Sequence, residues 1–227
     1  MRRSLAMLAA ILASPFATCA ATPPVESVAE ALTPGIFLDN AEERASLSRL
    51  PPRRATEKGV ALVKGFEGFR ARLYNDAAGY CSIGYGHLIK KSACDGTEPA
   101  EFRDGVNEQA AIALLRQDLG AAEAAATTLV TARLNDGQHD AIVSFVFNVG
   151  TGNFRRSTLL RVVNGGPESY NEVRLQLRRW VKAGDRTWPG LQKRREREAD
   201  MFFDEVGEPR APAIDLMPID IRLGEAR

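Results

Sequence analysis

The sequence predicts an α+β fold in which a small sheet lobe precedes a larger all-helical lobe, with a cleft between them. One observation is a helical apolar pattern around residues 57–67, followed directly by short β-favouring runs over residues 70–87. The other is a series of amphipathic helical patterns from residue 107 onward. With 227 residues, 44% of them hydrophobic, the chain can bury a sizeable core.

The first helix and the hairpin can be read from local signals. In "EKGVALVKGFEGF", Val60, Val63 and Phe66 have helical spacing, and Gly68 follows where a helix can stop, so Glu67 is expected at the helix C-terminus. In "RARLYNDAAGYCSIGYGH", the turn-forming pair at 75–76 and a later glycine separate β-favouring runs. This predicts a hairpin or a small three-stranded sheet.

The remaining patterns predict five helices. A long one begins after Asn107 and continues through an alanine-rich stretch. The segment "NDGQHDAIVSFVFNVG" is the most apolar and predicts the central buried helix, ended by Gly150. The others are expected over residues 157–165, 167–184 and 191–204.

The two ends of the chain have a different character from the middle. Two arginines, an apolar run and then small residues predict a secretory signal over residues 1–21, cleaved to release an exported protein into the periplasm or medium. Proline-rich and charged stretches predict a flexible tether over 22–56 and a disordered tail over 206–227, which leaves the domain at 57–205. An uncleaved anchor and lipidation at Cys19 remain alternatives.

Whether the cysteines form a disulfide also depends on export. Once the signal is removed, Cys81 and Cys94 are the two cysteines left, and an oxidising compartment favours a disulfide between them. Two small buried thiols are the alternative.

Charge excludes some classes of partner. The formal net charge is +1, so no nucleic-acid partner is expected, and the N-terminal apolar run is shorter than a conventional membrane span. The charges are unevenly distributed: residues 155–200 hold twelve Lys and Arg against six Asp and Glu, whereas residues 95–140 hold three against nine. A basic helical half would suit an anionic polymer.

Three polar residues could share one space between the lobes. Glu67 ends a helix, Asp76 lies in the hairpin nine residues later, and Ser82 is on the returning strand. Two carboxyl groups flanking a gap, with a hydroxyl beside one of them, are the groups that inverting glycoside hydrolysis needs. Solvated surface carboxylates are the simpler interpretation of the spacing alone.

The stretch "FEGFRARLYNDAAGYCSIGYGH" resembles the start of the phage-type lysozymes, glycoside hydrolase family 24. That family has Glu, eight residues, Asp, five residues and Thr, then a Gly-x-Gly-His-like turn, which match Glu67, Asp76, Ser82 and residues 84–87 here. The segments "FNVGTGNFRRSTLL" and "RWVKAGDRTWPGLQKRREREADMF" resemble the family's central and terminal helices. The likeness covers about two thirds of the chain and implies a lysozyme-like fold.

The resemblance implies a role for each matching residue. Glu67 would be the general acid, with its pKa raised by an apolar wall, and Asp76 would stay ionised and act with Ser82 on the attacking water. The family usually has threonine at the position of Ser82, so the hydroxyl is kept and the methyl that limits its rotamers is lost. Arg194, or its neighbour Arg195, would lie against the glutamate.

The sequence contains two histidines. His87 is expected to make a structural hydrogen bond or ion pair behind the hairpin, and His139 to be a surface or capping residue. Two histidines without paired ligands predict no metal site, and no cofactor is expected.

The implied activity is that of a peptidoglycan-hydrolysing muramidase. It would cleave the β-1,4 bond between N-acetylmuramic acid and N-acetylglucosamine, acting as a monomer on glycan strands. Two alternatives are a lytic transglycosylase, which would have no use for Asp76 and Ser82, and a non-catalytic wall-binding or scaffold domain of an envelope machine. A phage lysis role and a cellular wall-remodelling role both fit, and the long tether favours the second.

Overall fold

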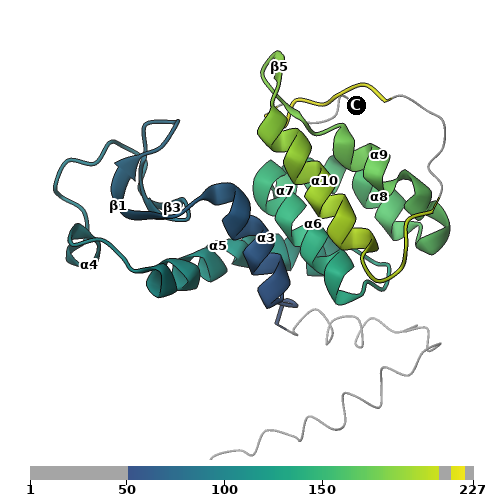
Figure 1. Cartoon of the computed structure of the whole chain (residues 1–227), viewed down its shortest axis with the longest axis horizontal. Coiled ribbons are helices and arrows are strands. Elements are labelled where there is room, and N and C mark those ends of the chain that lie inside the picture. Colours follow the sequence, from purple (N-terminus) through teal and green to yellow (C-terminus); the bar gives the residue numbers. More distant parts are fainter. Residues whose placement is uncertain (1–50, 210–215, 223–227) are drawn as a thin grey trace, which may run out of the picture. The chain divides into compact units, whose positions relative to one another are not determined.

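The computed structural model describes residues 51–209 and 216–222. The predicted signal, Cys19 and most of the predicted tether lie outside these residues. The described residues all belong to one structural unit, whose arrangement is shown in Figure 1. Within them, no helix combines the length and the apolar character needed to cross a membrane.

Helix α3 (Glu57–Glu67) begins and ends at the residues that the sequence signals indicate. The side chain of Thr56 caps its N-terminus by accepting a hydrogen bond from the backbone N–H of Gly59, and Val60 and Val63 are buried. Gly68 follows with a φ of 71°, a left-handed value that glycine adopts without strain. Glu67 is therefore the last residue of the helix, at the point where the chain turns into the sheet.

The predicted small sheet is present and has three antiparallel strands in the order β1-β2-β3. They are β1 (Arg70–Asn75), β2 (Cys81–Gly84) and β3 (His87–Lys90). The central strand β2 is buried throughout and packs on helix α5 (Glu108–Leu129). Gly84 makes this contact close, because a Cβ there would lie 3.0 Å from the Cβ of Ala111.

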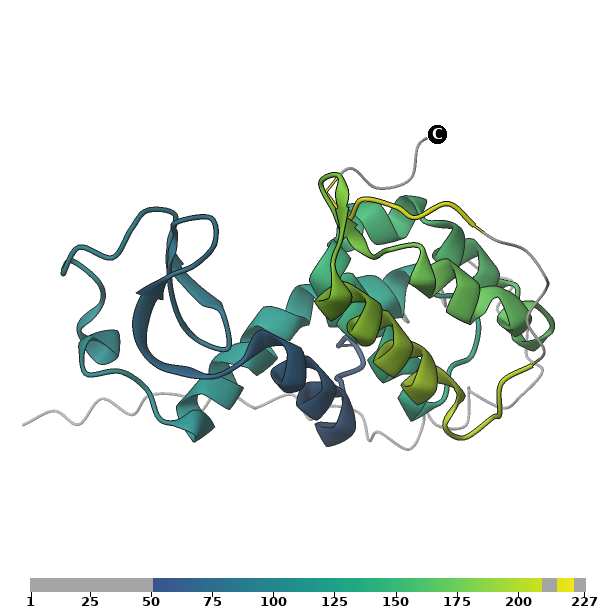
Figure 2. The ribbon, with the colours of Figure 1, turned by 45° about the horizontal axis from the view of Figure 1, so that its top comes forward.

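The helical lobe is built around α6 (Asp136–Val149), which contacts α3, α5, α7 and α10. A capping box between Asn135 and Gln138 begins the helix, and most of its residues are buried. Figure 2 shows α5 running from the sheet lobe into the helical lobe, with α3 beside it. The other helices are α4 (Ala100–Arg103), α7 (Thr151–Arg156), α8 (Thr158–Asn164), the 3-10 helix η1 (Pro167–Glu172), α9 (Val173–Arg178) and α10 (Pro189–Phe203).

The single helix expected over residues 167–184 is wrong. The segment is divided into η1, α9 and a two-stranded hairpin of β4 (Lys182–Ala183) and β5 (Arg186–Thr187). Gly184 has a φ of 71°, which a helix cannot contain, so the chain reverses there. This hairpin brings Trp188 to the start of α10.

The domain is also longer than residues 57–205. At its start, the backbone N–H of Ala55 donates to Glu123 Oε1 at 2.9 Å and Arg54 pairs with the same carboxylate at 2.8 Å, so the end of the predicted tether is bound. Part of the predicted disordered tail is bound as well, because Ile219 is buried in the core. Two isoleucines separated by Asp220 allow this short segment to add to β4.

Candidate active site

Glu67 is held by an arginine from the far end of the chain. Its carboxylate Oε1 accepts a hydrogen bond from Nη1 of Arg194 at 2.7 Å, while its side chain stays 26% exposed. The guanidinium of Arg194 also lies over the ring of Phe66, 5.3 Å from the centroid. Glu67 is thus oriented by α10 and still open to an incoming molecule.

Arg194 is in turn fixed by buried partners. Its Nε donates to Glu198 Oε1 at 3.1 Å, and its Nη2 donates to the carbonyl oxygen of Ser144 at 3.2 Å. The hydroxyl of Ser144 donates to the same Glu198 oxygen at 2.7 Å. Hydrogen bonds to charged groups are strong and reinforce one another within a network. The buried network of α6 and α10 therefore fixes Arg194, and Arg194 sets the position of the Glu67 carboxylate.

Arg195 has a different environment from its neighbour. It is fully buried, pairs with Glu198 Oε2 at 3.0 Å, hydrogen-bonds Asn148 and lies over the ring of Phe145. Burial lowers the pKa of Arg195 to about 10, an effect that Glu198 opposes, so the group stays charged at neutral pH. Of the two arginines considered from the sequence, Arg194 is the one that contacts Glu67.

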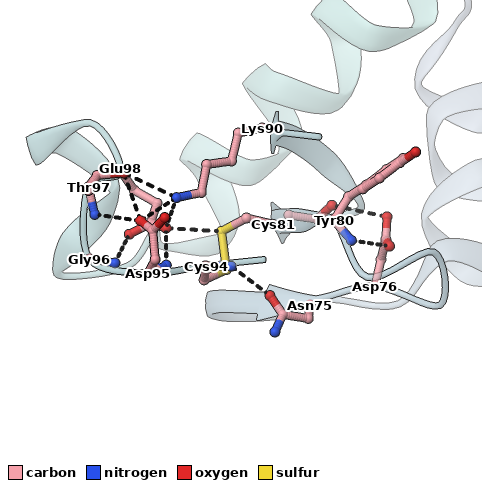
Figure 3. The surroundings of a disulfide bond; sticks show 11 residues. Asn75, Asp76, Tyr80, Cys81, Lys90, Cys94, Asp95, Gly96, Thr97 and Glu98 are labelled. Atoms are coloured by element: carbon pink, nitrogen blue, oxygen red, sulfur yellow. Dashed lines mark hydrogen bonds and ion pairs between the residues drawn. A yellow bond between two sulfur atoms is a disulfide. The ribbon is translucent and has the colours of Figure 1, made fainter. Parts of the chain in front are cut away.

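Asp76 is fixed by the turn that contains it. Its Oδ1 accepts hydrogen bonds from the backbone N–H groups of Ala78 and Tyr80, at 2.8 and 2.9 Å, and Figure 3 shows the bond from Tyr80. The other oxygen, Oδ2, lies 3.5 Å from the hydroxyl of Ser82. That separation is long for an O–H···O bond, so both atoms keep capacity for a further polar partner.

The pKa of Tyr74, on β1, responds to both carboxylates. Burial raises the pKa of its phenol, Arg70 opposes this, and Asp76 and Glu67 both add to the increase. Both acidic residues therefore lie within electrostatic range of one side chain on β1. Glu67 ends α3 where the chain enters the sheet, Asp76 and Ser82 lie together in the β1–β2 hairpin, and the pocket beside Glu67 is lined by neither of them.

The predicted disulfide between Cys81 and Cys94 is present, with the two Cα atoms 4.8 Å apart (Figure 3). It joins β2 to the loop after β3. On the strand side, Asn75 Oδ1 accepts a hydrogen bond from the backbone N–H of Cys94 at 2.8 Å. The bridge therefore supports the strand on which Ser82 lies.

Glu98 lies near the bridge and completes a group of three potential metal ligands. The two sulfurs and a Glu98 oxygen lie within 4.8 Å of one another. Both sulfurs are used by the disulfide, however, and Glu98 pairs with Lys90 at 2.8 Å and accepts backbone hydrogen bonds from Asp95 and Gly96. These contacts lower the pKa of Glu98 to about 2 and satisfy the carboxylate without a metal.

Removing the disulfide is expected to weaken the sheet lobe. Replacing Cys81 and Cys94 together by alanine frees the loop that they close, which should reduce the free energy of unfolding by about 3 kcal/mol. Urea unfolding of the variant and of the parent, each with and without reductant, measures the loss. Reductant should lower the midpoint of the parent and leave the variant unchanged; equal midpoints for oxidised parent and variant would contradict the prediction.

The two histidines have structural surroundings. His87 Nδ1 lies 3.0 Å from both carboxylate oxygens of Asp118 on α5, the type of contact expected from the sequence. His139 was expected at the surface or as a cap, and this is wrong: it is buried within α6, whose N-cap is Asn135. The apolar face of α6 turns this position inward, with Nδ1 3.8 Å from Asp140.

A pocket of about 380 Å³ opens beside Glu67. Its wall is mainly apolar and comes from α3, α6, β4, α10 and the segment after residue 215. Trp188 is 51% exposed at its edge. The lining residues are Phe66, Glu67, Asn148, Ala183, Trp188, Gly190, Leu191, Arg194 and Ile221.

Three residues of the candidate site were not identified from the sequence, namely Glu198, Ser144 and Trp188. Glu198 had a usable signal, because it follows Arg194 by four residues and Arg195 by three, the spacings at which side chains meet on a helix. Ser144 lies in an otherwise apolar helix, which indicates a buried hydroxyl that needs a partner. Trp188 had no local signal of its own.

The family model described as Phage lysozyme matches residues 64–198, which include Glu67, Asp76, Ser82 and Arg194. The chain belongs to the phage lysozyme family. Membership makes this lysozyme a glycoside hydrolase of the muramidase class and is consistent with its α+β architecture.

Relatives agree with this assignment. The lysozyme is 37% identical to an endolysin of Acyrthosiphon pisum secondary endosymbiont phage 1 over 151 residues, which are 65% of this chain and 96% of the relative. It is also 37% identical over 137 residues to a SAR-endolysin of Bacteriophage PS119, covering 60% of this chain and 76% of that protein. Among solved structures, the muramidase domain of SpmX from Asticaccaulis excentricus matches with a TM-score of 0.56 and 33% identity, over 66% of this chain and 97% of that domain.

Proposed function

We propose that this lysozyme cleaves the β-1,4 bond between N-acetylmuramic acid and N-acetylglucosamine in peptidoglycan by inverting hydrolysis. Glu67 is the general acid that protonates the leaving oxygen, and Asp76 with Ser82 positions and activates the attacking water. The observation that carries the proposal is the Glu67 carboxyl, held by Arg194 at the edge of a pocket while Asp76 is fixed in the adjacent turn.

The surroundings of Glu67 support its role as the acid. One oxygen accepts from Arg194, which leaves the other oxygen for the proton that is transferred to the glycosidic oxygen. Phe66 and the other apolar residues of the pocket lie beside this carboxyl group, where the glycosidic oxygen of a bound glycan would have to approach it. The buried network behind Arg194 keeps the acid in one position during the reaction.

The surroundings of Asp76 support its role toward water. Two backbone N–H groups donate to Oδ1 and fix the carboxylate in the turn, which leaves Oδ2 as the oxygen that can accept a proton from water. The Ser82 hydroxyl, 3.5 Å from Oδ2, can hydrogen-bond the same water molecule. Because the disulfide restrains β2, the spacing between the two groups is maintained.

Ser82 provides a graded test of this arrangement. Ser82→Ala should lower kcat by about 10- to 100-fold, because the water loses one of its two positioning partners. Ser82→Thr should match or exceed the parent, because the added methyl restricts the hydroxyl to fewer rotamers. Initial rates on soluble peptidoglycan measure both. An alanine variant with the parental kcat would show that the hydroxyl is dispensable.

Product stereochemistry tests the mechanism as a whole. Inversion at a β bond releases the α anomer first, so proton NMR spectra recorded immediately after mixing should show α-configured reducing ends before they equilibrate. Initial formation of the β anomer would establish retention. It would exclude direct attack on the anomeric carbon by a water molecule held at Asp76.

We also propose that the lysozyme acts outside the cytoplasm after cleavage of residues 1–21. The N-terminal pattern, the disulfide and the similarity to endolysins support this placement. The mass of the protein recovered from the periplasm should match the chain without its first residues. An intact N-terminus would instead support a retained anchor.

A further inference from the structure

The C-terminal strap, residues 216–222, follows the region matched by the family and is anchored in the helical lobe. Ile219 is buried, and its backbone N–H donates to the carbonyl of Arg179. The backbone N–H of Ile221 donates to the carbonyl of Lys182 at 2.9 Å, and its own carbonyl accepts from Asn153 Nδ2 at 2.7 Å. These bonds fix the strap at β4.

Ile221 of the strap lines the same pocket as Glu67 and Arg194. A volume of about 380 Å³ remains with Ile221 in place. The strap therefore forms a wall of the pocket and does not fill it. The hydrogen bonds on both sides of the Ile221 peptide hold that wall in position.

Trp188 forms another part of the wall. Its indole Nε1 donates to the carbonyl of Ala183 at 3.1 Å, and its backbone N–H donates to the carbonyl of Val181 at 2.9 Å. The ring is thus held by the β4–β5 hairpin although half of its surface is exposed. An indole fixed in this way presents an apolar face at low cost in side-chain entropy.

The chemistry of this wall matches one kind of occupant. A pyranose ring has an apolar C–H face that packs on an indole, and an acetamido group adds a methyl suited to an aliphatic surface such as Ile221 and Leu191. Asn148 provides a polar side chain at the same pocket. Small pockets of this type, mainly apolar with a few polar groups, are typical of ligand sites.

We propose that Trp188 and the C-terminal strap form a subsite that binds one N-acetylated hexosamine ring of the glycan next to Glu67. This inference rests on the proposed function. It gives Ile221, which lies outside the family match, a share in substrate binding, with Asn153 as the anchor of the strap.

Binding can be measured separately from catalysis in a Glu67→Gln background. The probe is a purified glycan tetrasaccharide of alternating N-acetylglucosamine and N-acetylmuramic acid, titrated by calorimetry. Trp188→Ala and Ile221→Ala should each weaken binding about 10-fold or more, because each removes apolar surface from the contact. Met217→Ala is the matched control: it is on the same strap, is 80% exposed and does not line the pocket, so the Kd should stay within about twofold.

The same substitutions in the active enzyme should raise KM more than they lower kcat. Ile221 also packs against the core, so Ile221→Ala should unfold at a lower midpoint than Met217→Ala, and binding is compared at a temperature at which the circular dichroism spectra show both variants fully folded. Unchanged Kd and KM for Ile221→Ala, or faster hydrolysis after deletion of residues 216–227, would overturn the proposal. If the Glu67→Gln protein binds the tetrasaccharide in this strap-dependent way but the parent hydrolyses no glycan, the proposed function fails while the subsite stands.

Discussion

Replacing Glu67 by glutamine is expected to lower kcat on peptidoglycan by about 10²- to 10⁴-fold while the domain stays folded. Glutamine has nearly the same volume and its carbonyl oxygen can still accept from Arg194, but it has no proton to give to the leaving oxygen. Turbidity clearing by purified protein measures the rate, and the circular dichroism spectrum checks the fold.

Glu101→Gln is the control for this substitution. Glu101 is an exposed acidic residue on α4, so the same chemical change there should leave kcat unaffected. A Glu67→Gln variant that retains near-parental turnover would show that another group supplies the proton.

Glu198→Gln should produce the largest loss of stability among single polar substitutions in the helical lobe. Glu198 is fully buried and pairs with both Arg194 and Arg195, so removal of its charge leaves buried guanidinium groups with incomplete compensation. Breaking a buried pair in this way costs about 3–5 kcal/mol of unfolding free energy. Turnover should fall as well, since Arg194 positions Glu67.

Glu196→Gln is the matched control on the same helix. Glu196 is 39% exposed and pairs with Arg174 and Arg178, so its loss should cost no more than about 1 kcal/mol. Adding Arg195→Met to Glu198→Gln should recover part of the stability by removing the uncompensated charge. Equal urea midpoints for Glu196→Gln and Glu198→Gln would contradict the importance of the buried network.

The part of the site built from neighbouring residues could be predicted from the sequence. Gly68 ends α3 directly after Glu67, and turn-forming residues around Asp76 produce the hairpin. Both effects depend on the conformational preferences of neighbouring residues. These preferences correctly predict that Glu67 ends a helix and that Asp76 and Ser82 share a hairpin.

The part built from distant segments could not be predicted in this way. Arg194 and Arg195 are adjacent and both buried. Which of them contacts Glu67 depends on which face of α10 is turned toward it, and that face is set by packing between distant segments. The strap pairs with β4 across about 40 residues, and no local pattern specifies that pairing. Proline-rich composition predicted a disordered tail, yet two isoleucines bind residues 216–222 of it to the helical lobe.

The most direct test of the account is the chemical identity of the new sugar ends. Peptidoglycan digested by the parent protein, reduced with borohydride and analysed by mass spectrometry should contain reduced N-acetylmuramic acid at every newly formed end, and digestion by Glu67→Gln should yield almost none. Ends made of reduced N-acetylglucosamine would contradict the proposed bond. Anhydro-N-acetylmuramic acid, which borohydride does not reduce, would contradict hydrolysis by water positioned at Asp76 and Ser82.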